Sequence, residues 1–154
     1  MATVYSIQKT KWEQNVPSEK IDTTELAGRV RVAFAEYEAS SLASGDVVQM
    51  FNLPNGARIV SGRLAHDALN SSTTLSVGYA AHTNAAGTAV SLSAAAYKAA
   101  GSSASATAAN VANTIALGEN SIVDANKDGL PVSVTLGGAS ADGTIQLTMM
   151  YVVD

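Results

Sequence analysis

The chain has 154 residues and a mass of 15.7 kDa, a size typical of one domain, and it contains no cysteine. Its net charge of −4 and its pI near 5.0 exclude a general nucleic-acid-binding protein, because such proteins need a basic surface. Without cysteine there are no disulfides and no cysteine-based zinc sites. Alanine supplies 28 of the apolar residues, and the 44 larger ones suffice for one modest core. No apolar stretch is long enough to span a membrane, and the first residues lack the apolar core of a signal peptide.

Residues 1–28 are expected to form an extended N-terminal arm, and residues 29–154 a β-sandwich domain. Thr10 and Asp22 each precede a glutamate by three residues, and this capping-box spacing predicts a short helical turn after either of them. Neither segment is long enough to be a stable helix alone. We therefore expect the arm to become ordered by lying on another surface.

Alternation of apolar residues predicts a series of short strands after the arm. On the first of them, Val30, Val32 and Phe34 are expected to face the core. Asn55 and Gly56 predict a hairpin turn, because Asn-Gly tolerates the positive φ angles of tight hairpins. The later strands are expected over residues 47–51, 59–66, 74–79, 115–117, 122–123, 132–136 and 145–153.

Residues 82–113 are mostly Ala, Ser, Thr and Asn. Leu92, Ala96 and Ala99 have helical spacing, which predicts a short Ala-rich helix over about residues 91–100. A flexible linker is the alternative. About eight strands and one helical insertion at residues 82–113 predict an all-β fold, either a jelly roll or another Greek-key β-sandwich.

The residues with catalytic potential do not form a recognisable site. His66 and Asp67 are neighbours on a predicted strand and point to opposite faces, so they cannot act as a base and its orienting partner. His82 lies at the edge of the segment 82–113, which carries little charge. Glu36 and Glu38 share one face of a strand, as a carboxylate pair would, but the solvated end of an exposed face explains them equally simply. We expect no catalytic site and no cofactor.

A weak calcium candidate remains. Asp124, Asn126 and Asp128 match the D-x-N-x-D-G opening of a calcium loop. Such a loop requires a bidentate carboxylate at its twelfth position, where this chain has Thr135. The alternative is a polar turn between strands in which Asp128 and Gly129 provide the bend.

Only six charged residues lie between Ala68 and Val153. Because soluble monomers usually carry a charged surface, this segment favours a protein that hides much of its surface in an assembly. The alternative is a soluble β-domain coated with Ser and Thr. Trp12, the only tryptophan, is either an anchor for a partner's pocket or a cap over the chain's own sandwich.

Residues 53–59 (LPNGARI) and 70–78 (NSSTTLSVG) resemble the capsid decoration, or cement, proteins of tailed bacteriophages. The Ala-rich segment and the closing apolar strand are similar in style, and the resemblance covers residues 45–100 best. It implies a non-enzymatic jelly-roll protein that trimerises on the outer surface of the phage head and clamps neighbouring major capsid subunits.

The resemblance implies a virion component assembled in the host cytoplasm. Its partners would be the major capsid protein and further copies of the chain in a homotrimer, with no nucleic acid and no membrane. The candidates for capsid contact are Lys9, Lys11 and Trp12. The candidates for contact between subunits are Arg58, Arg63, Leu92 and Tyr97. The alternatives are another phage structural component, such as a head-fibre base, tail or baseplate protein, or a carbohydrate-binding β-sandwich.

Overall fold

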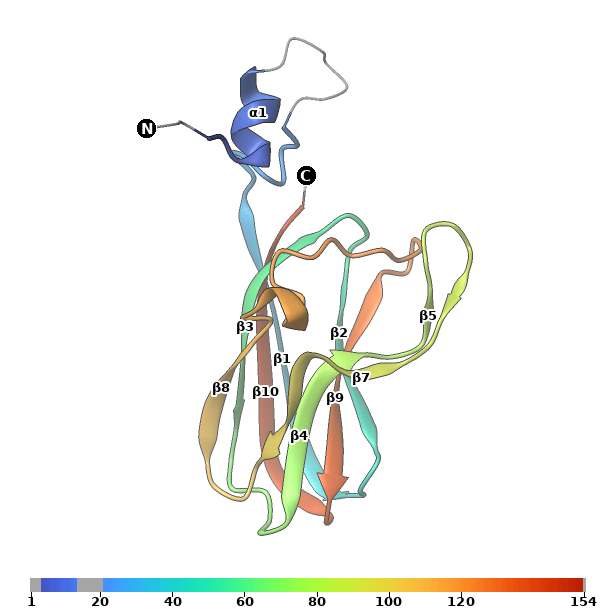
Figure 1. Cartoon of the computed structure of the whole chain (residues 1–154). Helices are drawn as coiled ribbons and strands as arrows, with labels where there is room; N and C mark the ends of the chain where they lie inside the picture. Colours follow the sequence, from blue (N-terminus) through green and yellow to red (C-terminus); the bar gives the residue numbers. More distant parts are fainter. Residues whose placement is uncertain (1–3, 14–20, 154) are drawn as a thin grey trace.

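The computed structural model describes residues 4–13 and 21–153 of the chain (Figure 1). In the described part the only α-helix is α1 (Ile7–Glu13), which lies in the arm, and a short 3-10 helix, η2 (Ile115–Leu117), lies between two strands. The strands are β1 (Val30–Leu42), β2 (Val47–Leu53), β3 (Arg58–His66), β4 (Thr73–Tyr79), β5 (His82–Thr83), β6 (Ala89–Val90), β7 (Ser93–Ser102), β8 (Thr107–Val111), β9 (Leu130–Gly138) and β10 (Ala141–Val152). Neither described helix has the length and apolar character needed to cross a membrane.

Eight of these strands form two four-stranded antiparallel sheets that pack face to face (Figure 1). One sheet has the order β1-β10-β3-β8 and the other the order β2-β9-β4-β7, while β5 and β6 form a small separate hairpin. The pairs β1–β10, β2–β9, β3–β8 and β4–β7 are nested, and successive pairs alternate between the two sheets. This wrapped double ribbon is a jelly roll, so the predicted fold class is confirmed.

The turn at Asn55 and Gly56 has a different role from the predicted one. Gly56 does adopt a positive φ, 78°, as Asn-Gly permits. However, β2 and β3 lie in different sheets, so the turn joins the two layers and is not a hairpin between paired strands. The Gly56 N–H donates to the Val123 carbonyl and the Val123 N–H donates to the Ala57 carbonyl, and these bonds fasten a later loop to this end of the sandwich.

The core fills the space between the two sheets with aliphatic side chains. The largest fully buried ones are Leu53, Ile59, Leu64, Leu75, Leu136, Ile145, Leu147, Met149, Val77, Val111, Val132 and Val134. Phe51, Tyr79 and Tyr151 pack against this cluster.

Strand β1 turns the opposite face to the core from the one predicted. Val30, Val32 and Phe34 are exposed by 58%, 60% and 59%. The inward residues are instead Ala33 and Tyr37, which pack against the core. The register with β10 explains the difference, because Ala33 lies opposite Met149 and Tyr37 opposite Ile145, both fully buried. Residues directly opposite each other in an antiparallel pair share a face of the sheet.

The predicted Ala-rich helix is wrong, because residues 93–102 form strand β7. β7 is the edge partner of β4, with Thr74 opposite Ser102 and Tyr79 opposite Ser93. An isolated ten-residue helix is marginal in water even when it is rich in alanine. As a strand, the segment gives the backbone of β4 its second partner and brings the Tyr97 side chain into the core.

Two other segments predicted as strands also differ. Residues 115–117 form η2, which is capped by Thr114, whose hydroxyl oxygen accepts a hydrogen bond from the Leu117 N–H at 3.2 Å. Ile122 makes only an isolated antiparallel bridge to Arg58. Segments of two or three apolar residues carry too little alternation to specify a strand, so neighbouring groups decide their conformation.

The arm is less extended than expected in its described part; residues 1–3 and 14–20 lie outside that part. Ser6, and not Thr10, caps α1: its hydroxyl oxygen accepts from the Lys9 N–H at 3.1 Å, and Thr10 lies inside the helix. Asp22 does begin a turn, as predicted, because its carboxylate accepts from the Thr24 N–H at 2.7 Å and its carbonyl accepts from the Glu25 N–H.

Candidate assembly surfaces

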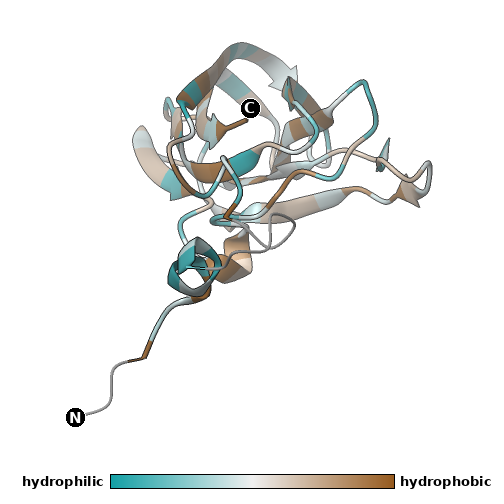
Figure 2. Ribbon diagram, turned by 90° about the horizontal axis from the view of Figure 1, so that it is seen from above, coloured by the Kyte–Doolittle hydropathy of each residue, from teal (hydrophilic) through white to brown (hydrophobic). Residues whose placement is uncertain are grey.

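Helix α1 presents apolar side chains but buries none of them. On the helix, Ile7 is 71% exposed and Trp12 is 58% exposed, and no helical residue is buried. Just before the helix, Val4 is 88% exposed and Tyr5 is 59% exposed. Figure 2 shows that α1 stands beside the sandwich in the view from above and does not cover it. A seven-residue helix gains little stability by itself, since helices of this length depend on packing. Its apolar side chains are therefore available to a partner.

The three capsid-contact candidates all lie on this helix. Lys9 forms an i,i+4 ion pair with Glu13 at 2.6 Å, in which both side chains are about half exposed. Lys11 lies 3.4 Å from Glu25, which belongs to the turn before β1. Trp12 does not cap the chain's own sandwich, which leaves its indole free to contact a partner.

A chain of charged groups fastens the arm to the sandwich. Glu25 accepts a hydrogen bond from the Lys11 ammonium, and its other carboxylate oxygen lies 3.6 Å from the Arg58 guanidinium. The Arg58 side chain, only 17% exposed, also donates to the Asn120 carbonyl at 2.9 Å. Arg58 thus connects three segments of its own chain. The contact between subunits predicted for Arg58 stays a prediction.

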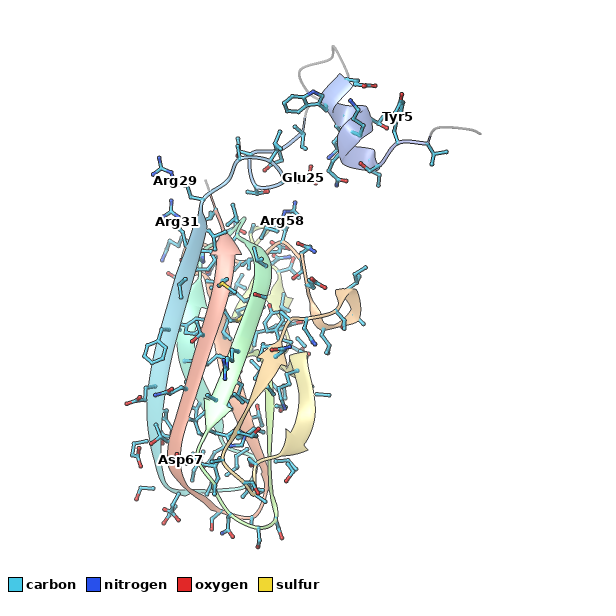
Figure 3. The ribbon with its side chains drawn as sticks, turned by 90° about the vertical axis from the view of Figure 1, so that its left-hand side faces the viewer. Tyr5, Glu25, Arg29, Arg31, Arg58 and Asp67 are labelled. Carbon is cyan, nitrogen blue, oxygen red and sulfur yellow. The ribbon has the colours of Figure 1, made fainter. Side chains whose placement is uncertain are left out.

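Positive charge gathers at the arm end of the molecule. Figure 3 shows Arg29, Arg31 and Arg58 at this end, near Glu25, and Asp67 toward the opposite end. Ion pairs among the described residues do not include Arg29 or Arg31. The arm end therefore offers cations beside exposed apolar side chains, a combination suited to a protein surface that carries acidic groups.

A second exposed apolar region lies on the outer face of the sheet β1-β10-β3-β8. It consists of Val30, Val32 and Phe34 on β1 together with Met150, which is 38% exposed and lies opposite Val32. We call it the β1 stripe. The sequence pattern suggested these β1 residues as core. Tyr37 on the opposite face of the strand was the available signal against that assignment, but alternation alone cannot choose between two faces.

A hollow of about 410 Å³ opens on the same outer face. It is lined by Ser61, Gly62, Arg63, Asn110, Val111, Asn113, Glu119, Thr148 and Met150. Arg63, predicted to contact another subunit, is exposed at this hollow. Its guanidinium has no hydrogen bond or ion pair within residues 4–13 and 21–153. The β1 stripe and the hollow share Met150, so they are continuous.

The part of this face farther from the arm is polar, and its carboxylates accept hydrogen bonds from neighbouring residues. Glu36 accepts a hydrogen bond from the Gln146 amide at 2.6 Å, and Glu38 accepts one from the Thr144 hydroxyl at 2.8 Å. Asp67 accepts from the Thr144 N–H at 3.2 Å. These bonds connect strands and surface loops. They do not make a reactive carboxylate pair.

The other two intersubunit candidates behave differently from each other. Leu92 is 45% exposed in the link between β6 and β7. Tyr97 is only 5% exposed and packs edge-on against Tyr79 with ring centroids 6.1 Å apart, so its ring is unavailable to another subunit. Burial raises the pKa of the Tyr97 hydroxyl far above its usual value.

The two histidines are held apart in separate local hydrogen-bond arrangements. The His66 ring Nδ1 lies 2.8 Å from the Asp67 carbonyl oxygen. The His82 ring Nδ1 and Nε2 lie 3.1 Å from the Ala80 carbonyl and 3.3 Å from the Asp124 carbonyl. Backbone oxygens, and not carboxylates, are therefore the neighbours of both rings.

The calcium candidates form a turn. The Asp128 N–H donates to the Asn126 side-chain oxygen, and the Asn126 amide donates back to the Asp128 carboxylate. Lys127 pairs with Asp128 at 2.6 Å, whereas the Asp124 carboxylate accepts from the Ala85 N–H. Thr135 lies within β9. Across the described ranges, three or more metal-binding His, Asp or Glu side chains do not gather at any point.

Comparisons with known proteins identify solved structures that share this fold. No protein-family model matches the chain, and no curated protein sequence shows significant similarity to it. Similar solved structures include a chain of the cyanophage Pam1 capsid asymmetric unit, with 22% identity and a TM-score of 0.60 over 82% of this chain and 86% of that one. A chain of the Ralstonia phage GP4 capsid has 20% identity and a TM-score of 0.61 over 82% and 86%.

A third similar structure is a chain of the acid-stable capsid of the Helicobacter pylori bacteriophage KHP30, with 17% identity and a TM-score of 0.53 over 80% of this chain and 87% of that one. Each likeness covers most of both chains, so the whole sandwich is shared and not only one sheet. At these identities the similarity is one of fold, and the chain has the jelly-roll fold found in these phage capsid structures.

Proposed function

We propose that the chain is a structural protein of a tailed-phage head, which decorates the outer surface of the mature capsid as a homotrimer and clamps neighbouring major capsid subunits. Its fold is shared with chains of three phage capsids. The low charge of residues 68–153 is consistent with a protein that works in an assembly and not as an enzyme.

The observation that carries the proposal is the exposed apolar surface of helix α1. This seven-residue helix buries none of its residues against the described part of the chain, and its Trp12 is exposed. Tryptophan is enriched among the residues that dominate binding energy at protein interfaces. Lys9 and Lys11 precede Trp12 on the same helix, and they would exchange their partners Glu13 and Glu25 for acidic groups of the capsid. The ion pairs of Glu25 hold the helix near the end of the sandwich.

Decoration would stabilise the capsid by mass action. A protein that binds only the mature lattice shifts the equilibrium toward it by RT ln(1 + [L]/Kd). Three arms on one trimer raise the effective concentration of the second and third contacts, so weak individual contacts together give firm attachment. Contacts that span capsomers would then resist the pressure of packaged DNA.

The test is binding of the purified chain to expanded, DNA-free heads built from the major capsid protein encoded with it. Deletion of residues 1–26 should abolish co-sedimentation with these heads while the circular dichroism of the sandwich is retained. Val47→Ser is the matched control, because Val47 is exposed on β2 in the opposite sheet. Undiminished binding by the deletion variant would refute the role of the arm.

The same preparation of expanded heads distinguishes the proposed function from the alternative functions. A tail, baseplate or head-fibre protein should bind its own substructure and not expanded heads. A carbohydrate-binding module needs aromatic side chains gathered on one platform, and the described exposed aromatics are Tyr5 and Trp12 in the arm and Phe34 on β1. A glycan array with strong, specific hits would favour that alternative.

A further inference from the structure

We propose that the outer face of the sheet β1-β10-β3-β8 is the contact between copies of this chain, with Phe34 of one copy seated in the hollow beside Arg63 of the next. The inference rests on the proposed homotrimer and names its interface. Phe34 is the largest side chain of the β1 stripe, and 59% of it is exposed. Aromatic side chains left in water at this level are typical of interface anchors.

The Phe34 ring and the hollow lie at the same height along the strand direction, which we call their level in the sheet. In the registers of three successive strand pairs, Phe34 lies opposite Thr148, Thr148 opposite Arg63, and Arg63 opposite Asn110. These four residues form a row across the sheet that begins with the ring on β1, and its other three members, on β10, β3 and β8, line the hollow. The hollow, about 410 Å³, has room for one large side chain.

The chemistry of the two ends of the row is complementary. Arg63 is exposed and has no partner among the described residues, and an arginine guanidinium stacks favourably on an aromatic ring. Among the other lining residues, Glu119 is ionised, whereas Asn110, Thr148 and Ser61 are polar but uncharged. Uncharged polar groups are removed from water at lower cost than ionised ones.

The common level has a consequence for symmetry. Rotation about an axis parallel to the strands leaves the level of every residue unchanged, so it brings Phe34 of one copy to the level of Arg63 in the next. The ring projects from the edge strand β1, and the hollow extends from β10 across β3 to β8 at the opposite edge of the sheet. Each copy can therefore give its ring to one neighbour and receive a ring from the other. In the proposed homotrimer three copies surround the axis, and this head-to-tail arrangement closes.

A second copy fits this face better than the capsid does. The arm supplies a separate apolar surface for the capsid, at the end of the molecule. The outer face carries both members of a complementary pair on one chain, which is what a contact between identical subunits requires. On the polar part of the face, Glu36 and Glu38 are held by hydrogen bonds within the sheet.

The decisive experiment uses the absence of native cysteine. In the double variant Phe34→Cys with Asn110→Cys, the two positions lie on the outermost strands of the sheet, three strand spacings or about 14 Å apart. This separation excludes a disulfide within one chain. After mild oxidation we expect a covalent trimer on a non-reducing gel that returns to monomer with reductant.

The matched control pairs Phe34→Cys with Ala108→Cys. Ala108 lies opposite Ala65, two residues along β8 from Asn110 and on the same face, but at a different level. We expect at least a fivefold lower yield of covalent trimer from this pair. A covalent dimer as the main product, no cross-linking, or equal yields from both pairs would overturn the proposed contact.

A second measurement separates this inference from the proposed function. Light scattering during size-exclusion chromatography should show a trimer for the native chain and for Val47→Ser, but monomer for Phe34→Asp and Arg63→Glu. Arg63→Lys, which keeps the charge but loses the planar group, should weaken the trimer about tenfold. A trimer that survives Phe34→Asp and Arg63→Glu refutes this interface and leaves the homotrimer intact. A native monomer without cross-linking refutes both, while binding to heads remains a separate test of decoration.

Discussion

The carboxylate of Glu25 lies 3.6 Å from the guanidinium of Arg58, and both side chains are largely shielded from water. Glu25 belongs to the arm, and Arg58 is the first residue of β3. The same carboxylate receives Lys11 of α1, so one acidic group connects the helix, the turn before β1 and the sandwich. The position of the candidate capsid-binding helix therefore depends on a single ion-pair network.

Glu25→Gln should release α1 without unfolding the sandwich. The amide keeps the shape of the side chain but loses its attraction for Lys11 and Arg58, at a cost of about 1 kcal/mol for a partly shielded pair. Hydrogen exchange should become faster in residues 7–13 and stay unchanged in β4 and β9. Unchanged exchange in the helix would show that other contacts position it.

Trp12→Ala should reduce affinity for expanded heads about 30-fold, the loss expected when an interface anchor worth about 2 kcal/mol is truncated. The thermal unfolding midpoint of the sandwich should not change, because the indole has no place in its core. Isothermal titration or co-sedimentation measures the affinity. Tyr5→Ala is a useful companion variant, since Tyr5 is equally exposed just before the helix.

Gly78→Ala should destabilise the fold by about 3 kcal/mol or more, because overpacked sites in rigid surroundings are costly. Gly78 lies on β4 against the neighbouring strand β7, where a methyl group would overlap the backbone of Ser93 and Ala94. A side-chain rotation cannot relieve a clash with backbone. Urea unfolding gives the free energy of unfolding directly.

Gly87→Ala is the control for that substitution. Gly87 lies in the β5–β6 turn with a φ of 84° and no atom near the added methyl group. Only backbone strain opposes alanine there, at about 1–2 kcal/mol. A loss for Gly78→Ala no greater than that for Gly87→Ala would contradict the close approach of β4 and β7.

The turn at Asp22 should be pH-dependent. Hydrogen bonds from the Thr24 hydroxyl and then the Thr24 N–H lower the pKa of the Asp22 carboxyl below its usual value. A carboxyl whose pKa is lower in the folded state stabilises that state above its unfolded pKa, and the contribution disappears as the pH falls through the folded pKa. The Thr24 amide signal in NMR should therefore change below about pH 4, and Asp22→Asn should remove this transition.

Much of the fold was predictable because most of its strands carry regular alternation and end at recognisable turns. Residues 59–66, 74–79 and 145–153 were predicted as strands, and the structure has β3, β4 and β10 there. The jelly-roll class followed from the number and spacing of such segments. The alternation of paired strands between the two sheets could not be read from these patterns, because pairing joins residues as distant as Val30 and Val152.

Local sequence patterns gave wrong predictions where they were compatible with two conformations of a segment or with burial of either face of a strand. The Ala-rich segment that forms β7 has good helical propensity, yet it is a strand because β4 needs an edge partner and Tyr97 needs a place in the core. Likewise, local patterns could not show the surroundings of Arg58, which stays a candidate for contact between subunits. Its nearest acceptors, Glu25 and the Asn120 carbonyl, are 33 and 62 residues away in the chain.

By itself the sequence determined the all-β class, the short N-terminal arm with its single tryptophan and the low-charge surface that favours assembly. Composition and the alternation of apolar residues at every second position are local properties, so they are the same in any arrangement of the strands. Only the tertiary structure decided which face of β1 is buried. The fixed register with Met149 and Ile145 on β10 turns Ala33 and Tyr37 inward and leaves Phe34 outside, in one row with Arg63.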